Sequence, residues 1–219
     1  MDFAFMAKHV PMYWEAAKLT LSLAFWGILC SLILGFACAM ALYYKVKGLR
    51  HVVTAYIELS RNTPLLIQLF FLYYGLTRVG LKLSSTACAV IGLTFLGGSY
   101  MAEAFRSGLE AVQRGQIESG LSLGLKKGQL MWYVILPQAL AVSMPALGAN
   151  LIFLIKETSM FSAVALADLM FVAKDLIGMY YKTNEALLML VVAYLIILLP
   201  LSLLMSWLER RVRHAGFGR

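Results

Sequence analysis

Five stretches of this chain are long enough and apolar enough to cross a lipid bilayer as helices. About 20 mostly apolar residues in helical conformation span the hydrocarbon core. The stretches are residues 16–44, 52–76, 86–109, 134–155 and 186–208, with a polar interruption at 61–64 in the second. We therefore expect an all-α membrane protein, in which residues 1–219 form a single domain with five transmembrane helices in the core 16–208.

Composition indicates the same class of protein. Of the 219 residues, 61% are hydrophobic and 14% are charged. Soluble domains are about 45–50% apolar and about 25% charged, so this chain has too few charges to cover a water-soluble surface. The cysteines Cys30, Cys38 and Cys88 lie in apolar stretches without the spacing of metal ligands or of a disulfide framework. We expect them to serve as small apolar side chains, and we expect no metal site.

The distribution of Lys and Arg predicts the orientation in the membrane. Basic residues are retained in cytoplasmic loops. With five spans, one side receives twelve of the 19 Lys and Arg residues and the other side receives seven. The N-terminus is therefore expected outside, with 1–15 along the outer interface, 161–177 as a short outer helix, and 209–219 as a basic cytoplasmic tail. The net charge of +8 then reflects topology, and no nucleic-acid partner is expected.

The interruption in the second span carries two charges and a proline. Glu58 and Arg61 are three residues apart, so they share a helix face and can pair. Pro64 lacks a backbone N–H and opens the helix, while Thr63 and Asn62 can satisfy the freed backbone groups. The pattern fits a kink that serves packing alone, and it equally fits a moving hinge.

A second polar group lies within the third span. The glycines at 97–98 permit either close helix approach or local unwinding, and Ser99, Tyr100 and Glu103 follow them. A carboxylate at membrane depth indicates a functional site with a partner. The partner of Glu103 could be Lys156, the ammonium group of a ligand, or a basic residue in a purely structural pair between helices.

The fourth span ends in a third polar group. Lys156, Glu157, Thr158 and Ser159 place both signs of charge and two hydroxyls at a helix end. That set suits a zwitterionic ligand. It also suits an ordinary helix terminus, where such side chains cap backbone groups.

The loop at 111–133 is too polar to span and has helical periodicity. Gly120, Gly124 and Gly128 recur at intervals of four, so a strip of small residues is expected on an amphipathic helix. Such a helix could lie on lipid headgroups or dock a protein. The glycines favour a protein, because lipid-binding helices usually present bulky anchors.

The same loop carries a motif. Glu118 is followed six residues later by Gly124, and a Leu-Pro pair at 136–137 ends an Ile/Leu-rich stretch. This spacing resembles the EAA loop of ABC importer permeases, with 119–120 as Ser-Gly where that family usually has alanines.

The resemblance extends over nearly the whole chain. Residues 57–64 are similar to the signature of the polar amino acid permeases, which include histidine, glutamine, arginine and cystine importers. Further matches are 100–103, 114–116, 136–139 and 156–159, although the family often has Asp at the position of Glu157.

The resemblance implies a permease subunit with the type I ABC importer fold in a bacterial inner membrane. Its partners would be a separate ATPase, an extracytoplasmic solute-binding protein and a second permease chain, identical or similar. The chain lacks the G-x-x-x-x-G-K-[ST] phosphate-binding motif. ATP is therefore expected on the ATPase, and this chain is expected to be neither an enzyme nor a cofactor carrier.

The resemblance also implies roles for individual residues in alternating access. The residues expected to couple to the ATPase are Gln116, Glu118, Ser119, Gly120, Leu123, Gly124 and Pro137. Those expected to meet a polar amino acid are Ser99, Tyr100, Glu103, Glu157, Thr158 and Ser159. Those expected to gate the path are Glu58, Arg61, Thr63 and Pro64. A permissive channel without a substrate site stays an alternative.

Two other classes of function have less support in the sequence. An ion-coupled secondary amino acid transporter would need internal repeats, and five spans divide poorly into repeats. A membrane enzyme would need clustered titratable groups at one interface. His9, His51 and His214 are scattered among the loops and ends, and no nucleophile–base pair is evident.

Overall fold

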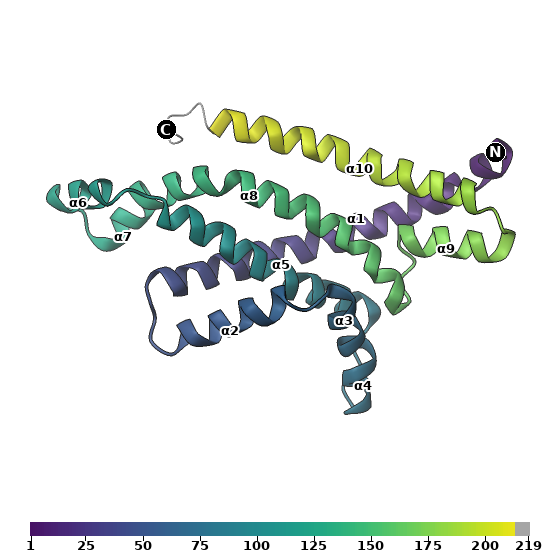
Figure 1. The fold of residues 1–219 in the computed structure, drawn as a ribbon, viewed down its shortest axis with the longest axis horizontal. Helices are drawn as coiled ribbons and strands as arrows, with labels where there is room; N and C mark the ends of the chain where they lie inside the picture. Colours follow the sequence, from purple (N-terminus) through teal and green to yellow (C-terminus); the bar gives the residue numbers. More distant parts are fainter. Residues whose placement is uncertain (213–219) are drawn as a thin grey trace.

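The computed structural model describes residues 1–212, and within this part the regular elements are all helical (Figure 1). In chain order the elements are α1 (Phe3–Tyr43), α2 (Leu49–Arg61), α3 (Leu65–Phe70), the π-turn η1 (Phe71–Gly75), α4 (Leu76–Arg78), α5 (Ser85–Glu110), α6 (Arg114–Ser122), α7 (Lys127–Leu130), the π-turn η2 (Met131–Ile135), α8 (Leu136–Glu157), the 3₁₀ segment η3 (Thr158–Val164), α9 (Leu169–Tyr180) and α10 (Thr183–Val212).

Four helical segments of the described chain are long and apolar enough to cross a membrane. They are Phe3–Tyr43, Ser85–Glu110, Lys127–Val164 and Thr183–Val212. The stretch at 52–76 is broken between α2 and α3, at the polar interruption 61–64 where Pro64 was expected to open the helix. Figure 1 shows α3 and α4 turning away from the direction of α2. Pro64 precedes α3, where its missing N–H interrupts no helical hydrogen bond.

α5 lies at the centre of the bundle and packs most extensively against α1 and α8. Small residues allow this approach. A Cβ added to Gly35 of α1 would lie 2.8 Å from the backbone nitrogen of Ala102 on α5. Close backbone approach at glycine is a common way for helices to associate in a membrane, where apolar side chains gain little by leaving lipid.

The N-terminal segment is continuous with the first span. We expected 1–15 to be a separate short segment, but α1 runs unbroken from Phe3 to Tyr43 with Pro11 in its first turns. The Asp2 carboxylate caps this helix by accepting from the Phe5 N–H at 2.9 Å. The Asp2 N–H donates to Glu185 Oε1 at 2.9 Å, which joins the start of α1 to α10. Whether the segment lies at the outer interface stays a prediction.

The fourth span continues further than expected, and the short helix after it begins later. η3 extends α8 as far as Val164, so the expected helix at 161–177 is wrong at its start. Ala165 ends η3 in the left-handed region at φ +58°, and Asp168 caps α9 by accepting from the Phe171 N–H at 2.9 Å. α9 then packs against α1 and α10.

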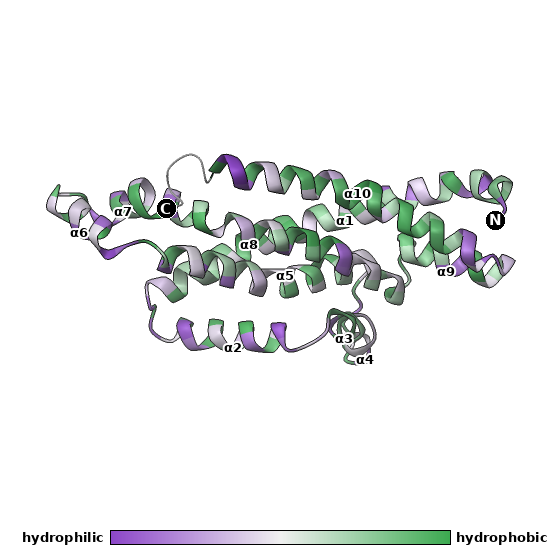
Figure 2. Cartoon of the chain, turned by 45° about the horizontal axis from the view of Figure 1, so that its top comes forward, coloured by the Kyte–Doolittle hydropathy of each residue, from purple (hydrophilic) through white to green (hydrophobic). Residues whose placement is uncertain are grey.

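α10 runs along the outside of the bundle, and few of its apolar side chains are buried. Figure 2 shows it as a nearly continuous green ribbon that becomes purple at its end, where Arg210 and Arg211 form the last turn. Residues 213–219 of the expected tail lie outside the described part of the chain. Figure 1 places α6, α7 and the end of α10 at one end of the molecule, opposite α9 and the N-terminus.

Candidate functional site

The break between α2 and α3 is held together by side chains. The Asn62 Nδ2 donates to the Glu58 carbonyl at 2.7 Å, and the Thr63 hydroxyl donates to the Leu59 carbonyl at 2.8 Å. These bonds satisfy carbonyls near the end of α2, as we expected of Asn62 and Thr63. Pro64 adopts φ −59° and ψ 142°, and α3 starts directly after it. Whether the break moves stays a prediction.

Glu103 forms the centre of a charge network between α2 and α5. Its Oε2 lies 3.2 Å from Arg61 Nη1 and 3.2 Å from Arg106 Nη2. Arg106 also pairs with Glu110 at 3.3 Å. The Glu103 side chain is 30% exposed and that of Arg61 is 40% exposed, so screening by solvent limits each pair to at most about 1 kcal/mol.

Two pairings that the sequence allowed are not formed, and the alternative of a structural pair between Glu103 and a basic residue of another helix is the one observed. Arg61 pairs with Glu103 on the neighbouring helix, and it does not pair with Glu58 three residues earlier. Glu103 pairs with two arginines and not with Lys156, which is exposed at the end of α8. Glu58 instead accepts a hydrogen bond from Asn62 at 3.3 Å and lines a charged cavity of about 280 Å³ together with Glu103.

A larger open cavity lies beside the break. It has a volume of about 630 Å³ and is lined by residues from α2, α3, α5, α8 and η3. Arg61 and Glu157 contribute opposite charges to this cavity, and Tyr100 contributes an aromatic ring. The Arg61 guanidinium carbon lies 5.2 Å from the centre of the Tyr100 ring, within the range of a cation–π contact. The site therefore offers both signs of charge.

Four of the expected substrate residues do not line this cavity, and one of them, Glu103, instead lines the smaller charged cavity. Ser99 is buried and its hydroxyl donates to the Leu96 carbonyl at 2.7 Å. Thr158 is also buried and donates to the Ile155 carbonyl at 2.7 Å. Ser159 is half-buried in η3. Because the Ser99 and Thr158 hydroxyls bond to the backbone of their own segments, neither is turned toward a ligand.

The glycines at 97–98 serve close packing in this structure. α5 stays helical through them, so the alternative of local unwinding is not seen. A Cβ on Gly98 would lie 2.6 Å from the Tyr56 hydroxyl of α2. That hydroxyl donates to the Phe95 carbonyl at 2.7 Å. Gly98 thus brings α2 against α5, which sets the distance between Arg61 and Glu103.

The expected docking loop forms a second site at one end of the molecule. α6 ends at Ser122, and a Schellman motif follows: the Leu125 N–H donates to the Gly120 carbonyl at 3.1 Å and the Gly124 N–H to the Leu121 carbonyl at 2.9 Å. Gly124 has φ +77°, a conformation that favours glycine. This turn leaves Leu123 83% exposed at the end of α6.

The three glycines of this loop do not form one contact strip, which corrects our expectation. Gly120 is buried inside the loop, where an added Cβ would lie 2.5 Å from Leu130 Cδ1. Gly124 is required by its positive φ, and an added Cβ at Gly128 would meet nothing within 4 Å. The exposed apolar side chains of α6 and the turn after it are instead Leu121 and Leu123, which lie among polar neighbours. Among the expected coupling residues, Gln116, Glu118, Ser119, Leu123, Gly124 and Pro137 are exposed.

Pro137 lies where the loop joins the fourth span. The Leu136 N–H donates to the Met131 carbonyl, five residues back, which is the hydrogen bond of a π-turn. The helix from Lys127 to Val164 is thus continuous, but it is widened by one π-turn just before Pro137, which has no backbone N–H to donate. Pro137 therefore shapes the connection between α7 and α8.

Comparison with known proteins decides the family. Residues 12–214 match the family described as the binding-protein-dependent transport system inner membrane component. The chain belongs to this family. It is therefore a transport subunit of the inner membrane, as the sequence motifs indicated.

Relatives in this transport family match along their whole length. The chain is 32% identical over 212 residues to the probable glutamine ABC transporter permease protein GlnM of Bacillus subtilis (strain 168), covering 97% of this chain and 98% of the relative. It is 32% identical over 214 residues to the glutamine transport system permease protein GlnP of Escherichia coli (strain K12), covering 97% and 98%. A crystal structure of an amino acid ABC transporter with histidines superposes with a TM-score of 0.89 at 34% identity, covering 96% of this chain and 99% of that chain.

One residue of this transport subunit's site was missed from the sequence. Gln68 of α3 is buried, and its Nε2 donates to the Ser60 carbonyl at 3.1 Å and to the Thr63 carbonyl at 3.0 Å. It therefore joins α3 to the end of α2 across the break. The available signal was an amide side chain in an otherwise apolar run, four residues after Pro64.

Proposed function

We propose that this chain is the permease subunit of an ATP-driven importer that moves a polar amino acid into the cytoplasm by alternating access. The main observation that indicates the substrate class is that Arg61 and Glu157 line the same cavity. An amino acid has one carboxylate and one ammonium group, and two opposite charges on one cavity match that pattern. The names of the relatives, which mention glutamine and amino acids, support the same class.

Residue roles follow from the cavity. Glu157 meets the substrate ammonium, and Arg61 meets its carboxylate, with the Tyr100 ring beside Arg61. Arg61 also pairs with Glu103, so the substrate carboxylate competes with Glu103 for the same guanidinium. Entry of substrate thus loosens the contact between α2 and α5. In this mechanism Glu103 acts on the gate and does not bind the ammonium.

Partners follow from the family and from the exposed end of the molecule. α6 extends beyond the ends of α5 and α8 (Figure 1), and Leu123 there has no apolar cover. A separate ATPase docks on α6 and moves α8 through the continuous helix that starts at Lys127. A solute-binding protein delivers substrate at the opposite end, and a second permease chain completes the pathway. ATP is bound by the ATPase and not by this chain.

Five membrane crossings fit this proposal, with α2 and the segment from α3 to α4 together making the broken second crossing. The N-terminus is then outside and the C-terminus is in the cytoplasm. Cysteine labelling tests this in a variant with Cys30, Cys38 and Cys88 replaced by alanine. Val79→Cys in the α4–α5 connection should react with an impermeant maleimide in whole cells, and Leu123→Cys only after permeabilisation. The reverse pattern contradicts the orientation.

Transport itself is tested in proteoliposomes that contain the assembled importer. ATP on the ATPase side, with no ion gradient, should drive uptake of labelled glutamine or histidine. Glu157→Gln should raise the KM roughly 10- to 150-fold, since a charge-assisted hydrogen bond contributes roughly 1.5–3 kcal/mol. Asp175→Asn on α9, which removes a carboxylate outside the cavity and outside the charge network of Glu103, is the matched control.

The outcomes separate the candidate functions. Uptake that needs an ion gradient and no ATP favours the secondary transporter. ATP-driven uptake with an unchanged KM in Glu157→Gln supports the importer but overturns the substrate site, in favour of a permissive channel.

A further inference from the structure

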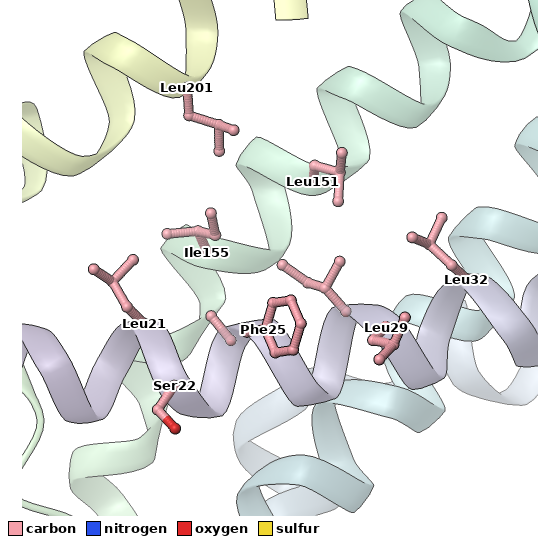
Figure 3. Close-up of a pocket in the computed structure, with 10 residues that line it drawn as sticks. Leu21, Ser22, Phe25, Leu29, Leu32, Leu151, Ile155 and Leu201 are labelled. Atoms are coloured by element: carbon pink, nitrogen blue, oxygen red, sulfur yellow. The ribbon is translucent and has the colours of Figure 1, made fainter. Parts of the chain in front are cut away.

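A groove without polar groups at its centre runs between α1, α8 and α10. It has a volume of about 560 Å³ and is lined by residues from these three helices. Figure 3 shows Leu21 of α1, Leu151 and Ile155 of α8 and Leu201 of α10 around one space, with Ser22 turned to the other side of α1. Ser22 is the one residue with a polar side chain in this lining.

The groove has the length of one bilayer leaflet. Its lining on α1 extends from Leu21 to Leu32, which is about 16 Å at 1.5 Å per residue. Half of the roughly 30 Å hydrocarbon core is about 15 Å. Because the groove begins only a few residues inside the start of the expected first span, it covers the leaflet on that side.

The chemistry of the groove selects the occupant. Apart from Ser22, its lining consists of apolar side chains from three helices. A polar amino acid would leave its charges unpaired against leucine side chains. A hydrocarbon chain matches this lining along its whole length.

A charge pair lies at the open end of the groove. Lys18 is three residues before Leu21 and seven before Phe25, so it lies on the face of α1 that lines the groove. The Lys18 Nζ is 2.7 Å from Glu15 Oε1, and their side chains are 53% and 69% exposed. This pair presents a cation and an anion beside the position that a lipid headgroup would take.

We propose that this groove is a binding site for one phospholipid, with an acyl chain between α1, α8 and α10 and the headgroup phosphate at Lys18. Glu15 beside Lys18 favours a zwitterionic headgroup with an ammonium group over an anionic one. The bound chain fills the space between α10 and the bundle. Without a bound acyl chain, α10 would have to move toward the bundle to fill this space.

The assembled importer, purified in mild detergent with extensive washing, tests the proposal by native mass spectrometry. Wild type should retain one phospholipid per copy of this chain, and added phosphatidylethanolamine should compete better than phosphatidylglycerol. Leu151→Trp fills the groove and should lower retention about tenfold, equivalent to losing about two buried methylenes. Lys18→Gln leaves the groove open and should lower retention about threefold.

The control is Ile33→Trp, on the same helix at a position that is 64% exposed and outside the groove lining. It should retain lipid as wild type does. Absence of retained phospholipid in wild type overturns the proposal, as does equal retention in wild type, Leu151→Trp and Lys18→Gln. Preference for phosphatidylglycerol overturns the assignment of the headgroup. Cross-linking of Leu29→Cys to a second permease chain would assign the groove to a protein interface instead.

Discussion

Truncation of Leu123 is the sharpest test of the docking surface on α6. Leu123 is 83% exposed and is held at the end of the helix by the turn at Gly124. Full burial of a leucine side chain contributes about 1.5–3 kcal/mol. Leu123→Ala removes most of that apolar area and leaves the backbone unchanged. We expect the ATPase to bind each α6 surface about 1.5–2 kcal/mol more weakly, which is roughly 10- to 30-fold in Kd.

The measurement is a titration of the isolated ATPase onto the permease in nanodiscs, without ATP. Val79→Ala is the matched control, because Val79 is 78% exposed and lies in the α4–α5 connection. The control should bind as wild type does. An unchanged Kd for Leu123→Ala would refute our placement of the ATPase contact, since a leucine buried by docking cannot be truncated without cost.

Three further predictions concern local structure. Gly124→Ala should destabilise α6 by about 1 kcal/mol because Gly124 has a φ of +77°, whereas Gly128→Ala, which adds a Cβ in open space, should not. Hydrogen exchange of the α6 amides measures both effects. Equal protection of these amides in the two variants would contradict the proposed role of the turn at Gly124. Gly98→Ala should cost about 1–3 kcal/mol by pushing against Tyr56, and an unchanged thermal unfolding midpoint in detergent contradicts the close packing. Burial raises the pKa of the Asp168 carboxyl from 3.8 to about 6, so the fold favours its neutral form. Its destabilising effect is absent below the unfolded pKa of 3.8, grows as pH rises from there to about 6, and is constant above that. Asp168→Asn keeps an N-capping side chain and should remove this part of the pH dependence of unfolding. An identical pH dependence in wild type and Asp168→Asn would contradict the assignment of this effect to Asp168.

Helix positions were largely predictable from apolar length. The third span was expected at 86–109, and α5 is Ser85–Glu110. The fifth was expected at 186–208, and α10 is Thr183–Val212. Backbone groups in lipid must be satisfied within their own helix, so the length of an apolar run nearly fixes the helix. The second span is an exception to this rule, because the chain changes direction at Pro64 and the polar residues before it.

The candidate sites were predictable in part. The spacing of Glu118 and Gly124 located the docking loop, and the polar group around Arg61 located the cavity. The partner of Arg61 was not predictable: Glu58 is close in sequence, but Glu103 from another helix lies 3.2 Å away. Ser99 and Thr158 were expected to meet substrate, yet their hydroxyls bond to nearby carbonyls. A sequence shows that a polar side chain is present at membrane depth and does not show which way it faces.

The sequence by itself determined that the chain is a bundle of membrane helices with motifs typical of ABC permeases, because apolar length and motif spacing are local properties. Only the tertiary structure decided which charges pair, which glycines serve packing, and that an apolar groove remains beside α10. These features depend on distances between helices that are far apart in the chain. In a membrane such distances are set by close packing at small residues such as Gly35 and Gly98, since lipid already solvates the apolar side chains.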